Sequence, residues 1–277
     1  MTEFAQGDPV WADLMTSDVA GARRFYGEVF GWTFEETPES FGGYVNVLRD
    51  GAVVAGLMGK EAGMEGIPDA WTVYLASDDA MTTTEAANAA GGTVHMPVAE
   101  VGDLGRMALM LDSAGANLGV WESGTHRGFA AMGTPGTPGW FEVHTKDYAG
   151  AKDFYAKTFG VTLAPMMETP EFSYCTFGEG EDASAGILDA ADALPAEAPS
   201  AWRIYWGVED ADAAIAAAER LGGRVTHPAE DSPYGRVAGL ADPWGAEFRI
   251  VQAAPGETLE QAEEETVLEQ PGEADAA

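Results

Sequence analysis

Residues 139–155 read GWFEVHTKDYAGAKDFY, and this stretch has a near twin, VWADLMTSDVAGARRFY, at residues 10–26. When Trp11–Trp32 is aligned with Trp140–Val161, ten of 22 positions are identical. Each copy first alternates between its two faces, as a half-buried strand does, and then carries apolar residues at helical spacing. The repeat therefore predicts the same strand-then-helix unit at two places in one chain.

Two further pairs of segments extend the repeat over most of the chain. AWTVYLASDDA at 70–80 matches AWRIYWGVEDA at 201–211, and GRMALMLDSAGA at 105–116 matches GRVAGLADPWGA at 235–246. A length of 277 residues suits two domains of about 120 residues each. We predict an N-terminal arm at 1–6, a first domain at 7–124, a Gly- and Pro-containing linker at 125–135, a second domain at 136–254, and an acidic disordered tail at 255–277.

Within each half, the order of expected elements also occurs twice. The first strand, Val10–Thr16, leads into a helix that Ser17 or Asp18 caps and Gly31 ends. A mid-domain strand leads into a second helix in the same way, and short strands follow both helices. We therefore predict an α+β fold in which each domain consists of two βαβββ units. The third strand after the first helix has no defined position in the sequence.

The charge and the single cysteine exclude several classes of function. Fourteen basic and 46 acidic residues give a formal net charge of −32, which repels nucleic acid and anionic membrane surfaces. Cys175 is the one cysteine, so neither a disulfide framework nor a multi-cysteine metal site is expected. The N-terminus lacks a signal-peptide pattern, and no apolar run is long enough to span a membrane, so we expect a cytoplasmic protein.

The recurring residues are those of a known superfamily. D-x-x-x-A-x-x-FY-x-x-x-FGW begins at Asp18, W-x-x-Y begins at Trp71 and Trp202, LGG precedes a strand, and D-P-x-G-A begins at Asp242. From residue 7 to 252 the chain resembles the vicinal oxygen chelate superfamily, which includes glyoxalase I, extradiol dioxygenases, and the fosfomycin and bleomycin resistance proteins. The tandem form with W-x-[D/E]-[L/V]-x-T-x-D resembles actinobacterial two-domain proteins related to a mycobacterial antigen, which carry glyoxalase-like or hydroxylase labels.

The resemblance implies that each domain is a pair of βαβββ units whose curved sheet forms a cup. Metal-dependent members hold a divalent ion there, typically with two His, or His and Gln, and one or two Glu. At the positions that would supply these ligands this sequence has Trp11, Thr72, Gly119, Trp140, Arg203 and Arg249. These side chains are not the ligands that divalent metals prefer, so we expect neither a metal nor another cofactor.

We expect aromatic side chains and one acid to line each cup instead. Residues two apart on a strand share a face, which groups a tryptophan, an acid and a third side chain on the first strand of each domain. The register of the mid-domain strands is open, because either the Trp or the Tyr of W-x-x-Y can face the cup. Arg106 and Arg236 recur in G-R-x-A and either position a ligand or form structural salt bridges. The predicted ligand-binding residues are Trp11, Asp13, Met15, Trp71, Arg106, Trp140, Glu142, His144, Trp202, Tyr205 and Arg236.

These residues favour a metal-independent protein that binds an apolar or aromatic small molecule, with the carboxylate as an anchor. Glu142 and His144 are candidate catalytic residues and leave two alternatives open: a non-standard metal site, or acid–base catalysis by a lyase, dioxygenase or hydroxylase in the second domain only. A third alternative is a regulatory protein that acts through its acidic surface and tail. A monomer and a homodimer are both compatible with the sequence.

Overall fold

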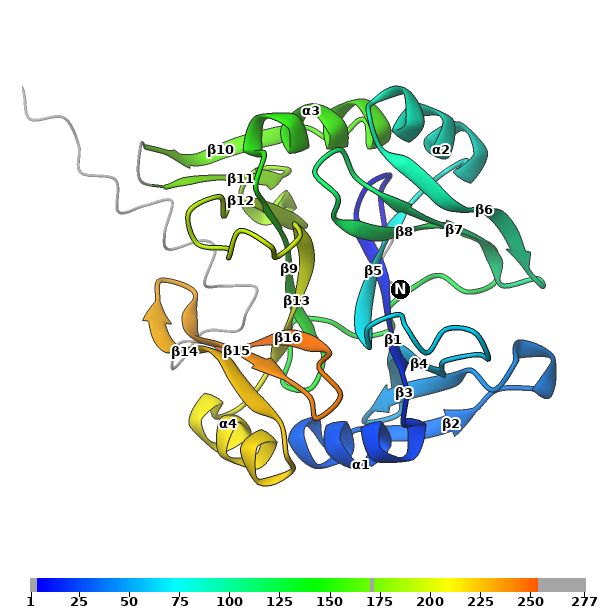
Figure 1. The fold of residues 1–277 in the computed structure, drawn as a ribbon, viewed down its shortest axis with the longest axis vertical. Coiled ribbons are helices and arrows are strands. Elements are labelled where there is room, and N and C mark those ends of the chain that lie inside the picture. The colour runs from blue at the N-terminus through cyan, green and yellow to red at the C-terminus, as the bar shows by residue number, and fades with distance from the viewer. Residues whose placement is uncertain (1–3, 170–171, 254–277) are drawn as a thin grey trace, which may run out of the picture.

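A computed structural model describes residues 4–169 and 172–253, which form two curved eight-stranded sheets and four α-helices (Figure 1). The predicted acidic tail at 255–277 and the first residues of the predicted arm lie outside the described residues. Within the described ranges, no helix is both long and apolar enough to cross a membrane.

The first sheet is built from the N-terminal half of the chain. Its elements are β1 (Pro9–Thr16), α1 (Val19–Phe30), β2 (Thr33–Glu36), the short 3₁₀ helix η1 (Glu39–Phe41), β3 (Val45–Arg49), β4 (Ala52–Gly59), β5 (Ala70–Ala76), α2 (Ala80–Ala89), β6 (Thr93–Val101), β7 (Gly105–Leu111) and β8 (Asn117–Ser123). The strand order is β2-β3-β4-β1-β5-β8-β7-β6. Because β1 pairs antiparallel with β5, the two βαβββ units join through their first strands.

The second sheet repeats this arrangement in the C-terminal half. Its elements are β9 (Pro138–Thr145), α3 (Tyr148–Phe159), β10 (Leu163–Glu168), β11 (Ser173–Phe177), the short 3₁₀ helix η2 (Gly180–Asp182), β12 (Ala185–Asp189), β13 (Ala201–Gly207), α4 (Ala211–Arg220), β14 (Arg224–Ser232), β15 (Gly235–Ala241) and β16 (Glu247–Gln252). The order is β10-β11-β12-β9-β13-β16-β15-β14. The predicted α+β fold of tandem βαβββ pairs is confirmed, and the strand without a defined position in the sequence is β2.

The repeated D-x-A-G-A motif starts α1 and α3. Asp18 accepts a hydrogen bond from the backbone N–H of Gly21 at 2.9 Å, and Asp147 accepts the same bond from Gly150 at 2.9 Å. A Cβ at either glycine would overlap the capping carboxylate, so the motif requires glycine at this position. A glycine in the left-handed conformation then ends each helix.

The two sheets stand back to back, and their concave faces open to opposite sides of the molecule (Figure 1). At the centre, β5 of the first sheet contacts β13 and β16 of the second, while α1 packs against α4 and α2 against α3. Apolar side chains fill the space between the convex faces, and Leu14, Phe141 and Trp206 are fully buried there. We call each concave face a cup.

A chain of hydrogen bonds crosses from the first domain to the second. Trp71 Nε1 donates to the Tyr26 hydroxyl at 3.1 Å, and this hydroxyl donates to Asp242 Oδ2 at 3.0 Å. The other oxygen of Asp242 accepts the backbone N–H groups of Trp244 and Ala246 at 3.0 and 2.9 Å in the turn between β15 and β16. The aspartate of the D-P-x-G-A motif therefore stabilises its own hairpin and accepts a hydrogen bond from a tyrosine of the other domain.

The repeat supplies the same chain in the opposite direction. Trp202 Nε1 donates to the Tyr155 hydroxyl at 2.9 Å, and Tyr155 donates to Asp112 Oδ2 at 2.8 Å. Burial raises the pKa of Asp112, and hydrogen bonds from the backbone of its turn and from Tyr155 oppose that rise. Each domain thus satisfies a buried carboxylate of its partner domain.

These chains correct the expectation that Trp71 and Trp202 line the cups. Side chains three apart on a strand point to opposite faces, so Trp202 and Tyr205 cannot both face the cup. Tyr205 bonds an acid on the concave face, while Trp202 is buried on the convex face beside Tyr155. Trp71 occupies the corresponding place and packs against Trp206 of the second domain.

The bond from Tyr155 to Asp112 provides a test of the coupling between domains. Tyr155→Phe keeps the ring but removes the partner of the Asp112 carboxylate and of the Trp202 indole, so we expect the free energy of unfolding to fall by about 1–3 kcal/mol. Urea denaturation followed by circular dichroism measures the loss. Tyr148→Phe alters a partly exposed hydroxyl on the same helix and should change stability by less than about 0.5 kcal/mol. Equal effects of the two substitutions would contradict the coupling.

Candidate functional site

The second cup contains a chain of hydrogen bonds that ends on an acid. Trp140 Nε1 donates to the Tyr174 hydroxyl at 3.0 Å, and Tyr174 donates to Glu142 Oε1 at 2.9 Å. Tyr174 reaches from β11 across β12 to β9, and its hydroxyl lies directly over Gly186 of β12, where a Cβ would overlap it. The tyrosine, the acid and the glycine between them are therefore one structural unit.

The first cup contains the same unit. Trp11 Nε1 donates to the Tyr44 hydroxyl at 2.8 Å, and Tyr44 donates to Asp13 Oδ2 at 3.4 Å. A Cβ on Gly56 would overlap the Tyr44 hydroxyl, as Gly186 would overlap Tyr174. Sequence reasoning did not identify Tyr44 and Tyr174 as cup residues. The available signal was that both tyrosines, and an A-G pair in the strand that each one crosses, recur in the two halves.

A second tyrosine approaches each acid from the mid-domain strand. Tyr205 donates to Glu142 Oε2 at 2.7 Å, and Tyr74 donates to Asp13 Oδ1 at 3.4 Å. The structure thus brings Trp140, Glu142 and Tyr205 together in one cup, as the sequence predicted. Tyr74 belongs to the first cup by the alternate register that the sequence left open.

The third side chain on this face distinguishes the two cups. His144 Nε2 lies 3.0 Å from Glu142 Oε2, whereas the first domain has Met15 at the equivalent place. Burial alone would raise the pKa of Glu142, but the hydrogen bond and charge of His144, with the bonds from Tyr205 and Tyr174, hold it below its ordinary value. Glu142 is therefore ionised at neutral pH.

The acid of the first cup has the opposite shift. Burial raises the pKa of Asp13 to about 7, and the hydrogen bonds from Tyr74 and Tyr44 offset only part of this rise. Met15 stands where the second cup has His144, so among the described residues no imidazole compensates a charge on Asp13 as His144 compensates Glu142. The duplicated network therefore has two different protonation states near neutral pH.

The segment predicted as a linker packs over one end of the first cup. The ring of His126 meets Trp11 edge to face with centroids 4.4 Å apart and lies 5.4 Å from Trp121. Phe129 adds a further contact to Trp11 at 5.5 Å. As a result, Trp11 and Asp13 are only 4% and 6% exposed. Their equivalents in the second cup, Trp140 and Glu142, are both partly exposed, so the second cup is the more accessible one.

Arg106 and Arg236 do not approach either acid. Arg106 pairs with Glu122 at 3.2 Å, and Arg236 pairs with Asp212 and Asp231, both at 3.0 Å. Both arginines lie on the helix-facing side of their strands, which is opposite to the cup, because residues two apart share a face and Ala108 and Ala238 on that face are fully buried. Neither arginine faces the cup, and both form the salt bridges that the sequence left open as the alternative.

The side chains that the structure describes in the cups do not form a set that fits a divalent metal. The indole N–H groups of Trp11 and Trp140 donate hydrogen bonds and cannot act as metal ligands. Arg203 is a cation that pairs with Glu247 at 3.0 Å. Among the residues that the structure describes, no three His, Cys, Asp or Glu side chains are close enough to hold one ion.

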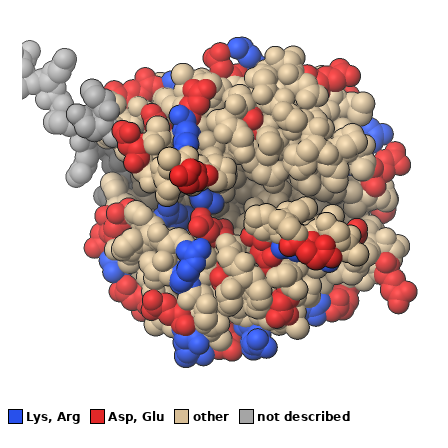
Figure 2. All heavy atoms as spheres, in the orientation of Figure 1, with Lys and Arg blue, Asp and Glu red and all other residues tan. Residues whose placement is uncertain are grey.

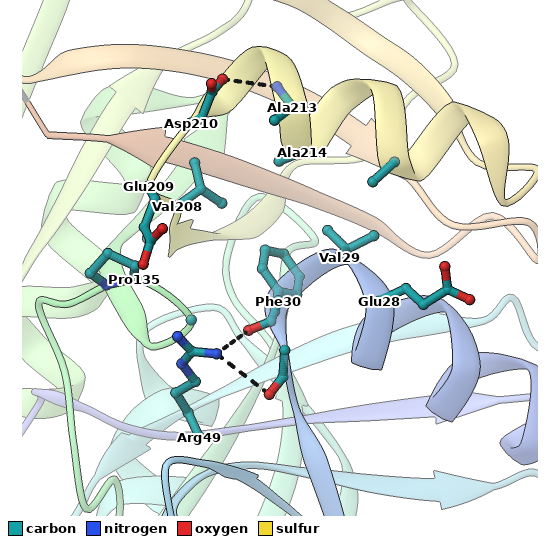
Figure 3. A pocket seen from close by; sticks show the side chains of 14 residues that line it. Glu28, Val29, Phe30, Arg49, Pro135, Val208, Glu209, Asp210, Ala213 and Ala214 are labelled. Carbon is teal, nitrogen blue, oxygen red and sulfur yellow. Dashed lines mark hydrogen bonds between the residues drawn. The ribbon is translucent and has the colours of Figure 1, made fainter.

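A separate pocket of about 330 Å³ opens between α1 and α4 (Figure 3). Its polar lining is largely engaged in ending helices. Arg49 donates to the Phe30 carbonyl at 3.2 Å, and Asp210 accepts the Ala213 backbone N–H at 2.9 Å to cap α4. We therefore place the candidate site in the second cup, where an acid, an imidazole and two tyrosine hydroxyls converge. None of these groups caps or ends a helix.

Comparison with known proteins connects this architecture to a family. Residues 137–250 match the family described as the Glyoxalase/Bleomycin resistance protein/Dioxygenase superfamily, and residues 10–47 match the one described as bleomycin resistance protein-like N-terminal. The chain is 34% identical over 258 residues to a Mycobacterium tuberculosis protein named as a glyoxylase, CFP32, covering 92% of this chain and 98% of that protein. It is 36% identical over 270 residues to the anthracycline biosynthesis protein DnrV of Streptomyces peucetius, covering 92% and 97%.

Solved structures show the same fold at lower identity. The Mn(II)-bound glyoxalase from Novosphingobium aromaticivorans superposes with a TM-score of 0.61 at 14% sequence identity, covering 90% of this chain and 83% of that one. This likeness concerns the arrangement of the sheets and helices.

The opposite pKa shifts of the two acids predict opposite pH dependences. The folded-state pKa of Asp13, about 7, lies above its ordinary value of 3.8, so the stability that Asp13 contributes is present below about pH 3.8 and is lost as the pH rises through 7. Asp13→Asn removes this loss. Its stability relative to the wild type should rise by at most about 3 kcal/mol between about pH 5 and about pH 8, because about two pH units of the loss fall in this interval.

Glu142→Gln is the matched variant in the other cup. The folded-state pKa of Glu142 is lowered, so its contribution is present above its ordinary value of 4.5 and is lost only as the pH falls through the lower folded value. The cost of Glu142→Gln should therefore be similar at about pH 5 and pH 8. Urea denaturation of both variants at the two pH values measures these differences. The same pH dependence for both variants would refute the assignment.

Proposed function

Because this chain belongs to the Glyoxalase/Bleomycin resistance protein/Dioxygenase superfamily, we propose that it is a small-molecule-binding protein that does not use a metal. Its ligand is an apolar or aromatic molecule held in the cup of the second domain. The observation that carries the proposal is the difference in exposure between the two copies of one network. Trp140, Glu142, Tyr174 and Tyr205 are all partly exposed, whereas three of their four equivalents in the first cup are buried.

The chemistry of the second cup supports a planar aromatic ligand. Trp140, Tyr174 and Tyr205 come from three strands, and all three aromatic residues are partly exposed. Aromatic rings stack favourably on such side chains, while a few fixed polar groups orient the ligand. The hydrogen bonds to Glu142 hold both tyrosines in place before a ligand arrives, which lowers the entropic cost of binding.

A second candidate function is acid–base catalysis on the bound molecule. The observation that favours it is the contact of His144 with Glu142, which occurs only in the second cup among the described residues. An ionised carboxylate on Nε2 orients an imidazole, and its other ring nitrogen can then exchange a proton with a substrate. The name of DnrV places that relative in anthracycline biosynthesis, and such chemistry would suit a biosynthetic role here.

Tryptophan substitutions in the two cups test the binding proposal. Trp140→Phe removes stacking area and the hydrogen bond to Tyr174, so it should weaken binding of a polycyclic aromatic probe such as anthraquinone by about 0.5–1.5 kcal/mol. Trp11→Phe, the same change in the buried cup, should leave the affinity unchanged. Equilibrium dialysis measures both. An affinity that is lost on removal of divalent cations, or equal effects of the two substitutions, would count against the proposal.

His144→Met separates binding from catalysis, because it introduces the side chain that the first cup has at Met15. If the protein only binds its ligand, the variant should retain the affinity of the wild type to within about 1 kcal/mol. Mass spectrometry of ligands incubated with each protein provides the second measurement. A product that the wild type forms and the variant does not would move the assignment to the catalytic candidate.

A further inference from the structure

Four neighbouring strands place a row of side chains across the second cup. In-register pairing aligns Trp140 of β9 with Tyr205 of β13, Tyr205 with Arg249 of β16, and Arg249 with Gly239 of β15. Because neighbouring strands lie about 4.8 Å apart, two strand spacings separate the backbones of Trp140 and Arg249 by about 10 Å. The equivalent row in the first cup is Trp11, Tyr74, Gly119 and Leu109.

The two rows differ by an exchange of a glycine and a large side chain. In the second cup, Gly239 leaves room for the guanidinium of Arg249, because a Cβ there would lie 2.9 Å from Arg249 Nη1. In the first cup, the ring of Tyr74 occupies the space over Gly119, where a Cβ would overlap it. The second cup therefore has the cation Arg249 at the position where the first cup has Gly119 under the ring of Tyr74.

Arg249 is not neutralised by its surroundings. Glu247 pairs with Arg203 at 3.0 Å and lies 3.9 Å from Arg224, so one carboxylate faces two other guanidinium groups. Arg249 itself forms no ion pair or hydrogen bond with the part of the chain that the structure describes. Burial lowers the pKa of Arg203 and the charge of Arg249 lowers it further, with Glu247 opposing. The row therefore carries surplus positive charge.

This local charge contrasts with the rest of the molecule. The formal net charge is −32, and acidic side chains are spread around the whole outline of the face shown in Figure 2. A free anion is repelled by such a surface, so an anionic ligand needs a specific cation in its binding site. Glu142, the acid on the strand of Trp140, is already bonded by His144 and two tyrosines.

We propose that Arg249, with Tyr205 beside it, forms a subsite that binds the carboxylate of an aromatic acid whose ring lies against Trp140. This inference rests on the proposed function and names the class of its ligand. The planar guanidinium matches a carboxylate through two parallel hydrogen bonds. The separation of about 10 Å between the backbones of Trp140 and Arg249 accommodates a bicyclic aromatic carboxylate once the Arg249 side chain extends toward the ligand.

The experiment compares 2-naphthoate with the uncharged 2-naphthamide on the full chain. The wild type should bind the acid at least about tenfold more tightly than the amide, because a bidentate ionic hydrogen bond exceeds a neutral one by this amount. Arg249→Gln should reduce the acid to the affinity of the amide and leave the affinity for the amide unchanged. Arg249→Lys keeps the positive charge but cannot donate two parallel hydrogen bonds, so this variant should keep part of the preference for the acid over the amide.

Arg236→Gln is the matched control. It makes the same change in net charge, but Arg236 pairs with Asp212 and Asp231 on the helix-facing side of the sheet, away from the cup. It should leave the preference for the acid intact. Equal wild-type affinity for the two probes, or an equal effect of Arg249→Gln on both, would overturn the subsite while leaving the aromatic cup in place. Binding of neither probe would contradict the proposed function and this inference together.

Discussion

The fold depends on a hydrogen bond from a buried tyrosine of each domain to a buried aspartate of the other. Tyr26 reaches Asp242 at 3.0 Å and Tyr155 reaches Asp112 at 2.8 Å. Each aspartate also holds the last hairpin of its own domain through backbone N–H groups. Because a buried carboxylate without partners is costly, neither domain can satisfy its hairpin acid fully when the other is displaced. The reciprocal bonds therefore position the sheets back to back and leave both cups facing outward.

The same combination of tryptophan, tyrosine and acid lies in the cups, where its surroundings decide its chemistry. In the first cup the linker residues His126 and Phe129 cover Trp11, and the acid loses contact with water. In the second cup the equivalent acid stays partly exposed and has an imidazole beside it. Burial and a neighbouring cation shift a carboxyl pKa in opposite directions, so one duplicated network yields an acid titrating near neutrality and an acid that is ionised.

The sequence predicted the fold well because the two halves are independent copies of one pattern. Strand alternation placed Trp140, Glu142 and His144 on one face, and the structure shows them there. Alternation could not decide which face of W-x-x-Y meets the cup, because the Trp and the Tyr each form a hydrogen bond on their own face of the sheet. As a result, Trp202 was predicted on the wrong face. The role of Tyr174 depends on Gly186 of β12, the strand that lies between Tyr174 and Glu142, and these three residues are far apart in the sequence, so no local pattern contains the contact. The salt bridges of Arg236 were an alternative that the sequence left open.

In each cup, the position of one large side chain depends on a glycine in the neighbouring strand. Arg249 can lie across β15 only because Gly239 has no side chain, and Tyr74 can cover β8 only because Gly119 has none. Arginine at residue 119 would meet the ring of Tyr74, and leucine at residue 239 would meet the guanidinium. A side chain at residue 119 therefore requires Tyr74 to move, and a side chain at residue 239 requires Arg249 to move. The row with Arg249 in the second cup and the row with Tyr74 in the first are thus alternative packings of one strand arrangement, and each has a glycine where the large neighbouring side chain lies.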